Sequence, residues 1–421
     1  MIKKYLCVLA LANLTVASAQ DGTSSPYSYY GFGEQRFKGV NEIKDMGGLA
    51  VYNDSLRLNT LNPASYGELK NATFSLGASY RDNTLKSNTQ KANTTTGSFD
   101  YFALSIPVGK IGIGLGIMPS HFTGYKTSSF TKESGMDVNS LHTGDGGINR
   151  TFLGIGYKIN KQFSIGAEVA YLFGDITNEV TKVVLDNGDG LALDRGTLGL
   201  QTNEYSGFDL NFAVNFKQPF SEKLFVNFTG TFSPEMTMDN NQKYTLSSVR
   251  ISDNSFTPIE TLEVNNSKRE LKNPMKYSFG AGIGDPFKWF IGAEYTATQA
   301  SVYNDNWNYN NVSFNDASKI AIGGFYTPKY NSYTSYLQRT TYRAGLRYED
   351  TGLEISNESI KDLGAHIGFG FPVGRNNSNL NIGLEYGKRG TKNNGLIQEN
   401  YFTLSVGFSF NDRWFEKRRF E

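Results

Sequence analysis

The feature that most constrains this fold is a series of short runs in which apolar residues alternate with small or polar ones. In the last run, every second residue from Phe402 to Phe410 is apolar, and the residues between them are Thr, Ser or Gly. A strict period of two places the two sets on opposite faces of a strand. About ten such residues ending on an aromatic are typical of the last strand of an outer-membrane β-barrel. A strand in a soluble sandwich alternates in the same way, so the rest of the chain decides between the two.

Fourteen such runs occur along the chain, and an even number is the rule for bacterial single-chain barrels. Short connections with turn residues alternate with long polar segments, and a secreted sandwich would not produce this alternation. The pattern predicts an all-β fold, a 14-stranded antiparallel transmembrane barrel that crosses the bacterial outer membrane many times. The connection at 327–338 is longer than the other short ones. The runs are 74–80, 102–108, 111–117, 153–159, 163–171, 208–216, 224–228, 277–283, 289–295, 320–322, 342–348, 365–371, 380–386 and 402–410, and the long segments are 82–98, 120–147, 175–203, 234–271, 301–316, 349–361 and 388–399.

The N-terminus predicts export. Lys3 and Lys4 precede an apolar stretch, and Ala17-Ser18-Ala19 forms a small-residue cleavage site, so residues 1–19 read as a signal peptide. The apolar stretch is too short to cross a bilayer as a helix. Cys7, the only cysteine, lies within this signal, so the mature chain has no disulfide.

The face opposite the apolar one is unusually rich in glycine. Glycine in a strand often marks the close approach of another backbone or a ligand. Few charged residues share this face, whereas a water-filled pore would be lined with charge. The pattern therefore predicts a barrel with a filled lumen. The glycines are Gly112, Gly114, Gly116, Gly154, Gly156, Gly166, Gly280, Gly282, Gly284, Gly364, Gly368, Gly370, Gly383 and Gly387.

Residues 20–70 are predicted to fill that lumen. They precede the first run and lack sustained alternation, yet they are rich in aromatic and apolar residues, as in Tyr27–Gly33. Disordered arms are poor in such residues. We therefore predict a compact plug at 20–70, a barrel at 71–410 and a periplasmic tail at 411–421.

The chain resembles a known family in this arrangement. Its glycine-rich N-terminal stretch, Gly47-Gly48, and Asn62-Pro63-Ala64 before the first of fourteen strands are similar to the FadL-type outer-membrane transporters of hydrophobic compounds. The charged extension 411–419 is a departure that looks like the Bacteroidota branch, which also includes barrels that are subunits of secretion or assembly machines.

The resemblance implies passive uptake of small hydrophobic molecules such as fatty acids. In the family, a plug blocks the barrel, extracellular loops capture the substrate, and a break in the third strand opens a sideways route. The partners would be outer-membrane lipid and a hydrophobic small molecule. The alternative is a non-transporting barrel subunit of an outer-membrane secretion or assembly complex, whose partners are other outer-membrane proteins.

Three sets of residues follow as candidate sites. Asn62, Pro63 and Ala64 are predicted to form the turn by which the chain leaves the lumen, because proline fixes φ and restricts the residue before it. Pro119, at the end of the third run, is the candidate lateral opening, or else it ends that strand at the membrane surface. A transporter needs an apolar pocket between plug and wall, and packing that fills this volume with protein would favour the subunit interpretation. The predicted lining is Leu49, Val51, Leu56, Leu58, Met118, Phe152, Leu172, Phe225, Phe290 and Phe325.

Other chemistry has little support in the sequence. His121, His142 and His366 are far apart and show no metal-ligand spacing, so we expect no metal, no cofactor and no enzyme activity. Removing Lys3 and Lys4 changes the formal net charge from +1 to −1, which gives no argument for a nucleic acid partner. The segment 303–309 mixes aromatics with amides and could contact a ligand or partner, although aromatic belts at the bilayer edge also use such residues.

Overall fold

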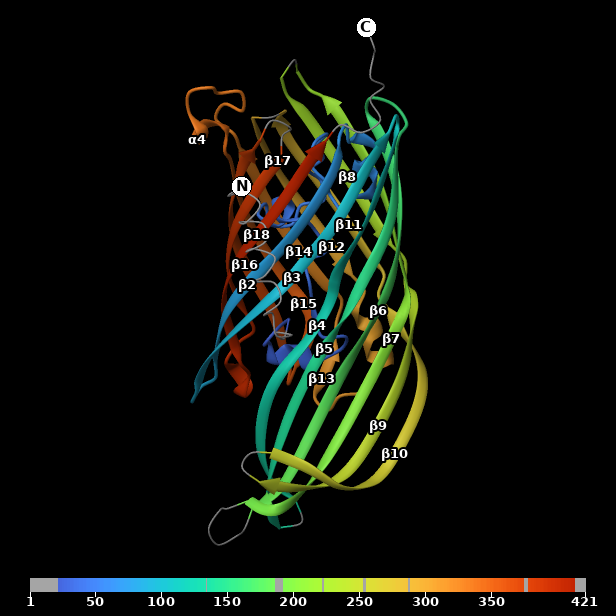
Figure 1. Cartoon of the computed structure of the whole chain (residues 1–421), viewed down its shortest axis with the longest axis vertical. Coiled ribbons are helices and arrows are strands. Elements are labelled where there is room, and N and C mark those ends of the chain that lie inside the picture. Colours follow the sequence, from blue (N-terminus) through green and yellow to red (C-terminus); the bar gives the residue numbers. More distant parts are fainter. Residues whose placement is uncertain are drawn as a thin grey trace, which may run out of the picture.

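The wall of the molecule is a single closed sheet of antiparallel strands (Figure 1). This computed structural model describes residues 22–133, 135–185, 192–221, 223–252, 255–286, 288–374 and 378–412. The wall contains β2 (Ala72–Lys86), β3 (Lys91–Val108), β4 (Ile111–Glu133), β5 (Met136–Lys158), β6 (Phe163–Leu185), β7 (Ala192–Pro219), β8 (Phe225–Ser233), β9 (Met236–Ser252), β10 (Ser255–Asn273), β11 (Lys276–Asp285), β12 (Trp289–Thr298), β14 (Ala317–Tyr326), β15 (Thr341–Ile355), β16 (Glu358–Val373), β17 (Ser378–Arg389) and β18 (Gln398–Asp412).

Two of the wall strands are interrupted. Both β8 and β9 pair with β7, so they form one strand broken at 234–235. In the same way β10 pairs with β9 and β11 with β8, which makes one strand broken at 274–275. Within the described residues the wall therefore has fourteen strands, and the ladder between β18 and β2 closes it. The predicted fold class is confirmed.

The alternation of side chains sets the two faces of the wall. Leu404 and Val406 point outward and are exposed in the isolated chain, whereas Thr403 and Ser405 are buried inside. An outward apolar band is what a bilayer requires. Among the described residues, no helix has the length and apolar character needed to cross a bilayer.

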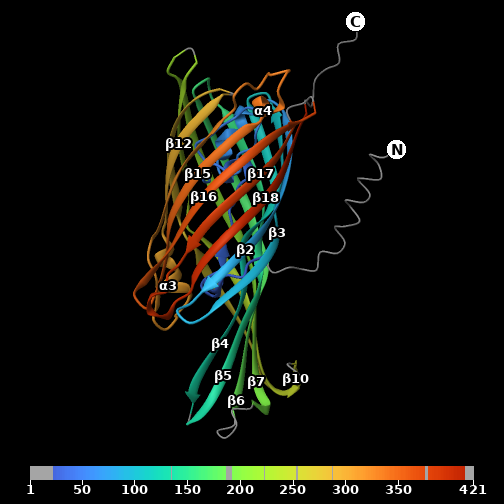
Figure 2. The ribbon, with the colours of Figure 1, turned by 90° about the vertical axis from the view of Figure 1, so that its left-hand side faces the viewer.

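Several segments predicted as loops are strands instead. Residues 120–147, 175–203 and 234–271 mostly continue β4–β7, β9 and β10 far past the other strands (Figures 1 and 2). We call this part the extension. Beyond a bilayer both faces of a sheet meet water, so apolar alternation stops while backbone pairing continues. The end with short turns is the periplasmic end by the rule for these barrels, and the extension lies at the opposite, extracellular end.

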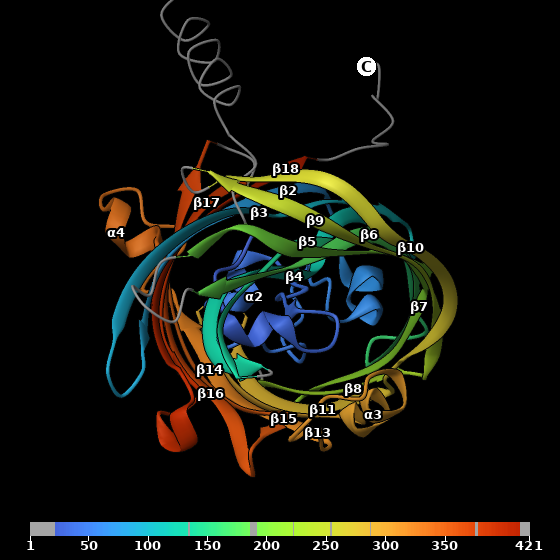
Figure 3. The same ribbon diagram turned by 90° about the horizontal axis from the view of Figure 1, so that it is seen from below.

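The chain ends differ slightly from the predicted boundaries. Strand β18 runs to Asp412, where Asn411 pairs with Thr73 and Asp412 with Ala72, so two residues of the predicted tail belong to the wall. The predicted signal peptide and residues 413–421 lie outside the described residues. The long connection at 327–338 leads into a short helix, α4 (Tyr336–Arg339), which projects from the periplasmic rim (Figure 3).

The N-terminal segment, residues 22–71, lies inside the ring of strands (Figure 3). It has no long element, because its contacts are with the wall more than with itself. The short elements of this segment are η2 (Pro26–Tyr29), β1 (Glu34–Gln35), α2 (Asn41–Lys44) and η3 (Pro63–Glu68), and those of the extracellular connections are η4 (Ala300–Val302), α3 (Tyr303–Asn306), β13 (Val312–Phe314) and η5 (Asn393–Gly395).

Candidate functional site in the barrel lumen

The glycines of the inner wall match the shape of the N-terminal segment. A Cβ atom added at Gly112 would collide with the carbonyl of Tyr66, and one at Gly166 would collide with the backbone of Pro63 and Ala64. Further round the wall, Gly323 and Gly345 make the same room for Met46, and Gly368 and Gly383 for Asp45. At Gly112, Gly166, Gly323 and Gly345 the neighbour is backbone, which cannot yield as a flexible side chain can, so only glycine fits there; at Gly368 and Gly383 the neighbour is the Asp45 side chain. Eight of the fourteen glycines predicted to face the lumen therefore lie against residues 22–71, whereas the nearest neighbours of the other six, Gly116, Gly282, Gly284, Gly364, Gly370 and Gly387, are wall residues.

Asn62, Pro63 and Ala64 begin the short helix η3 next to this wall. The side-chain oxygen of Asn62 accepts a hydrogen bond from the backbone N–H of Ala64 at 3.1 Å, which caps the helix. Its side-chain nitrogen donates to the carbonyl of Ala50 at 3.2 Å and to the Asn53 side chain at 3.1 Å. All these partners belong to the N-terminal segment itself.

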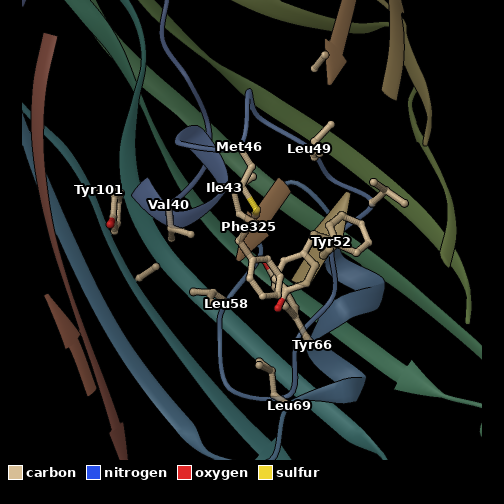
Figure 4. Packing of buried hydrophobic residues seen from close by; sticks show 14 of the residues in the cluster. Val40, Ile43, Met46, Leu49, Tyr52, Leu58, Tyr66, Leu69, Tyr101 and Phe325 are labelled. Atoms are coloured by element: carbon tan, nitrogen blue, oxygen red, sulfur yellow. The ribbon is translucent and has the colours of Figure 1, made fainter. Parts of the chain in front are cut away.

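Eight of the ten residues predicted to line a ligand pocket meet in one hydrophobic cluster (Figure 4). Each of the eight is at most 7% exposed. Of the other two, Leu172 joins a second cluster with Phe32, and Leu56 is half-buried. The eight are Leu49, Val51 and Leu58 from the N-terminal segment and Met118, Phe152, Phe225, Phe290 and Phe325 from the wall.

Tyr52 fills the centre of this cluster. Its ring centroid lies 4.9 Å from that of Phe290 and 5.1 Å from that of Phe325, and Phe225 stacks on Phe290 at 6.3 Å. These are the contact distances of packed aromatic rings. The volume in which an apolar ligand was expected is therefore occupied by side chains of the chain itself.

The cavity that does remain beside the N-terminal segment is lined in part by charged side chains. It has a volume of about 260 Å³ and lies between the segment and the wall. Charged groups of both signs line it together with aromatic and apolar side chains such as Phe37, Phe314 and Leu353, so it is of mixed character and differs from the purely apolar pocket that the sequence led us to expect. The charged residues are Glu34, Arg36, Lys38, Lys44, Arg81, Asp100, Lys276, Lys319, Arg347, Glu349, Asp362, Glu385 and Arg389.

Glu34 is the main anchor of the segment to this wall. Its carboxylate accepts 2.8 Å hydrogen bonds from both Arg81 and Arg389 and a further one from Thr23. Burial alone would raise the pKa of the Glu34 carboxyl, but Arg389, Arg81 and Arg36 hold it well below its usual value. The carboxylate is therefore charged, and its charge is fully matched by the wall.

A second anchor lies at α2. Lys44 reaches Glu385 at 3.4 Å, and the same carboxylate lies 3.3 Å from Arg347. A third lies below the apolar cluster, where Glu168 receives Arg150 at 2.6 Å and the Tyr66 hydroxyl at 3.1 Å. Segment and wall are thus joined by ion pairs at Glu34 and Lys44, and by the hydrogen bond of Tyr66 to the Arg150–Glu168 pair of the wall. The alternation along β6, β15 and β17 places Glu168, Arg347 and Glu385 on the inner face, but no sequence pattern indicates their partners.

The wall parts between β3 and β4. These strands pair only from Val108↔Ile111 to Phe102↔Ile117. Beyond that point, toward the extracellular end, β3 pairs with β2 alone. Strand β4 does not end at Pro119; it continues to Glu133, and its ladder with β5 skips one residue just after the proline. The alternative in which Pro119 ends the strand is therefore wrong. What ends near Pro119 is the pairing of β4 with β3. We call the gap between β3 and β4 on the extracellular side of this point the seam.

The N-terminal segment closes this seam from the inside. Strand β1 pairs with β4, Glu34 opposite Phe122, and the N–H of Arg36 donates to the Ser120 carbonyl at 2.9 Å. The guanidinium of Arg36 then crosses to β3, where it meets Asp100 at 3.3 Å. A second contact is a hydrogen bond of 2.6 Å between the hydroxyl of Ser24 in the segment and that of Thr94 on β3. Sequence reasoning missed this role of Glu34–Arg36, although charge inside an aromatic and glycine-rich segment was a usable signal.

The described residues offer little for other chemistry. No group of three or more His, Cys, Asp or Glu side chains among them could hold a metal ion.

Comparison with solved structures shows the class of this fold. The chain superposes on the CymD monoaromatic hydrocarbon channel with a TM-score of 0.58 at 13% identity, covering 92% of this chain and 100% of that one. A Pseudomonas aeruginosa FadL homologue gives 0.59 at 13% identity, covering 90% and 99%, and the P. putida toluene transporter TodX gives 0.55 at 14% identity, covering 90% and 99%. The protein therefore has the fold of the multi-pass FadL-type outer-membrane barrels; by their descriptions, CymD is a hydrocarbon channel and TodX is a toluene transporter.

Sequence comparison adds the family. The chain belongs to the BamG family, whose model matches residues 1–421. No curated protein is significantly similar to it in sequence.

Proposed function

We propose that this protein is a sealed outer-membrane barrel that acts as a non-transporting subunit of an outer-membrane secretion or assembly complex. The observation that carries the proposal is that one segment fills both parts of a FadL-type route. Tyr52 and its neighbours occupy the apolar centre, and β1 with Arg36 spans the seam. A subunit needs a stable wall and surface, whereas a transporter needs space for its substrate.

The energetics of the anchors support a permanently filled lumen. Removing one partner of a buried ion pair destabilises a protein by about 3–5 kcal/mol. Displacing the N-terminal segment would separate Glu34 from two arginines and Lys44 from Glu385 at once. A plug that cycles with each substrate molecule would have to break and remake all of these pairs.

Passive uptake of small hydrophobic molecules is the second candidate. Two observations favour it: the fold is shared with hydrocarbon channels, and the seam lies in the wall of the barrel beside β4, where a sideways route would open. Under this candidate the segment must move, at least at β1.

A disulfide across the seam separates the two candidates. The mature chain lacks cysteine, so Ser24→Cys with Thr94→Cys gives a single possible bond at the place where the two hydroxyls meet. If the barrel is a subunit, the oxidised variant will co-purify from native membranes with the same stoichiometric proteins as the wild type. If it is a transporter, oxidation will abolish uptake of a fluorescent fatty acid, and reduction will restore it. The single variant Ser24→Cys is the control for both arms.

The outcome that overturns the subunit proposal is specific. Wild-type barrel that purifies with a lipid-like small molecule and no stoichiometric protein would exclude it.

A further inference from the structure

A second cavity opens on the extracellular side of the N-terminal segment. It has a volume of about 300 Å³ and lies where the extension curves over α3. Three residues at matching positions of neighbouring strands form one side of the cavity: Asn178 on β6 lies opposite Gln201 on β7, which in turn lies opposite Tyr244 on β9. These three side chains form a row across neighbouring strands of the extension. The size is that of a small-ligand site.

The lining of this cavity combines aromatic rings with amides. Tyr29 stands at its edge and is 40% exposed, and its ring meets Tyr125 at 5.3 Å and Tyr309 at 5.8 Å. Arg269 is the one charged side chain among the described lining residues. The aromatic lining is Tyr29, Tyr125, Tyr205, Tyr244, Trp307 and Tyr309, and the amide lining is Asn178, Gln201, Asn203, Asn306 and Asn308.

Several polar groups here have bonding capacity to spare. The Asn178 oxygen accepts the Tyr125 hydroxyl at 2.7 Å, which orients the amide and leaves its NH₂ group toward other partners. The Gln201 NH₂ donates to Asn203 at 3.3 Å, and within the described residues the Gln201 oxygen has no partner. An amide offers both donors and acceptors, so the row can bond to hydroxyl groups in either sense.

This combination selects against most ligand classes. An apolar ligand would bury the amides without partners, which is costly. A metal ion would need carboxylates, and none lines the cavity. Nucleic acid would need more than one cation for its phosphates. A sugar ring matches each element, because its C–H face packs on aromatic rings and its hydroxyls bond to amides.

We propose that this cavity binds a saccharide carrying an acidic group, with the sugar ring against the tyrosines, its hydroxyls on Asn178 and Gln201, and the acid facing Arg269. The source is either a free oligosaccharide or the outer sugars of a lipopolysaccharide, since both carry this chemistry. The site uses Asn306–Tyr309 of the 303–309 segment, in which Asn306 is held by hydrogen bonds to the backbone of Lys272 on β10. It is separate from the lumen anchors, so it does not depend on whether the barrel transports.

Trp307 is a built-in reporter for the test. The chain has three tryptophans, so Trp289→Phe with Trp414→Phe leaves Trp307 alone. This variant, purified in a detergent without a sugar headgroup, is titrated with trigalacturonic acid, with maltotriose, and with a lipopolysaccharide and its delipidated polysaccharide. We expect a saturable change in Trp307 emission with trigalacturonic acid, and a weaker response to the neutral maltotriose.

Matched variants decide the assignment. Gln201→Ala and Tyr244→Ala should each weaken binding about tenfold, the loss expected for one or two hydrogen bonds or a ring contact. Arg269→Gln should remove the preference for the acidic sugar, and Tyr333→Ala, fully exposed at the opposite end, should change nothing. Heat-modifiability on gels checks that every variant is folded.

The results that overturn the proposal are equally definite. One such result is that no probe changes the Trp307 emission at concentrations up to about 10 mM, because a weaker affinity is negligible. Another is that Tyr244→Ala binds the probes as tightly as the parent variant does. Binding of lipopolysaccharide without binding of its delipidated polysaccharide would also overturn it, because recognition would then lie with the lipid. Binding of that polysaccharide identifies lipopolysaccharide as a source, and response to trigalacturonic acid alone identifies a free oligosaccharide.

Discussion

Glu34 and Arg389 are separated by 355 positions in the sequence, yet their side chains meet at 2.8 Å inside the barrel. Arg389 also holds Asp362 at 2.8 Å, so the pair connects the N-terminal segment to β16 and β17 together. The same Glu34 begins the backbone pairing that closes the seam. Glu34 therefore has two roles: it anchors the segment to β17, and it begins the short strand β1 that covers the seam.

Neutralising Glu34 should loosen the segment. Glu34→Gln leaves Arg81 and Arg389 buried with less countercharge, and a broken buried pair costs about 3–5 kcal/mol. We expect faster proteolysis within residues 22–71 and higher conductance of the barrel in planar bilayers. Glu260→Gln, an exposed position on β10, is the matched control. Unchanged conductance and proteolysis in Glu34→Gln would show that Glu34 is not an anchor.

Deleting residues 22–62 should leave a barrel that still inserts but conducts small hydrophilic solutes. The wall strands pair with one another and need no segment contact for their ladders. The glycines that lie against Asp45–Gly47, such as Gly323, Gly345 and Gly368, would then border open water. Liposome swelling with a small sugar measures the effect. A deleted barrel as impermeable as the intact one would mean that loops or side chains of the wall seal the lumen.

The glycine face gives a test of fit. Gly112→Ala places a methyl group on the carbonyl of Tyr66, so η3 must shift, whereas Gly230→Ala meets only the Phe279 ring at an ordinary 3.8 Å. We expect both variants to insert, and only Gly112→Ala to expose the segment to protease. Equal protection of the two variants would argue that η3 has room to move.

The two faces of β18 should respond differently to charge. Val406→Lys places a cation against lipid, at a cost of about 2–4 kcal/mol near the midplane, so the yield of folded barrel should fall. Ser405 is buried beside Gly383 and Asp45, so Ser405→Lys should insert but displace α2. Heat-modifiability reports the first effect and proteolysis of the segment the second. Loss of insertion in both variants alike would contradict the assigned faces.

Acidic pH should tighten the docking of α2. Burial raises the pKa of Asp45 from 3.8 to about 7, although Arg343 and Lys44 act in the opposite direction. Because this raised pKa belongs to the docked state, docking is strongest with the carboxyl protonated and weakens as pH rises from about 4 to about 7. Protection of the segment from protease should therefore fall between about pH 4 and about pH 7 and change little above that. Asp45→Asn should remove this dependence, and a variant that keeps it would assign the titration elsewhere.

The sequence predicted the wall well and its contacts poorly, for physical reasons. Runs such as 402–410 are visible because lipid demands an apolar residue at every outward position. The strands of the extension were not recognised in the sequence, since both of their faces meet water and nothing requires apolar residues to alternate with polar ones. The wall residues of the apolar cluster were identified because they occupy inward-facing positions of their strands. The alternation of faces cannot tell whether a ligand or Tyr52 fills the space between them. The bond between Glu34 and Arg389 joins distant parts of the chain and leaves no local pattern.

The position of the segment's partners has a consequence for how the protein is made. Residues 22–71 leave the inner membrane first, yet Ser25 bonds to Glu399 on β18 and Glu34 to Arg389 on β17, which arrive last. The segment therefore lacks these two bonds until β17 and β18 are present, although its contacts with β4, β5 and β6 belong to the first half of the chain. Strand β18 also closes the wall, through its ladder with β2. We therefore expect the last anchors of the segment and the closure of the wall to be completed together, because both need β17 and β18.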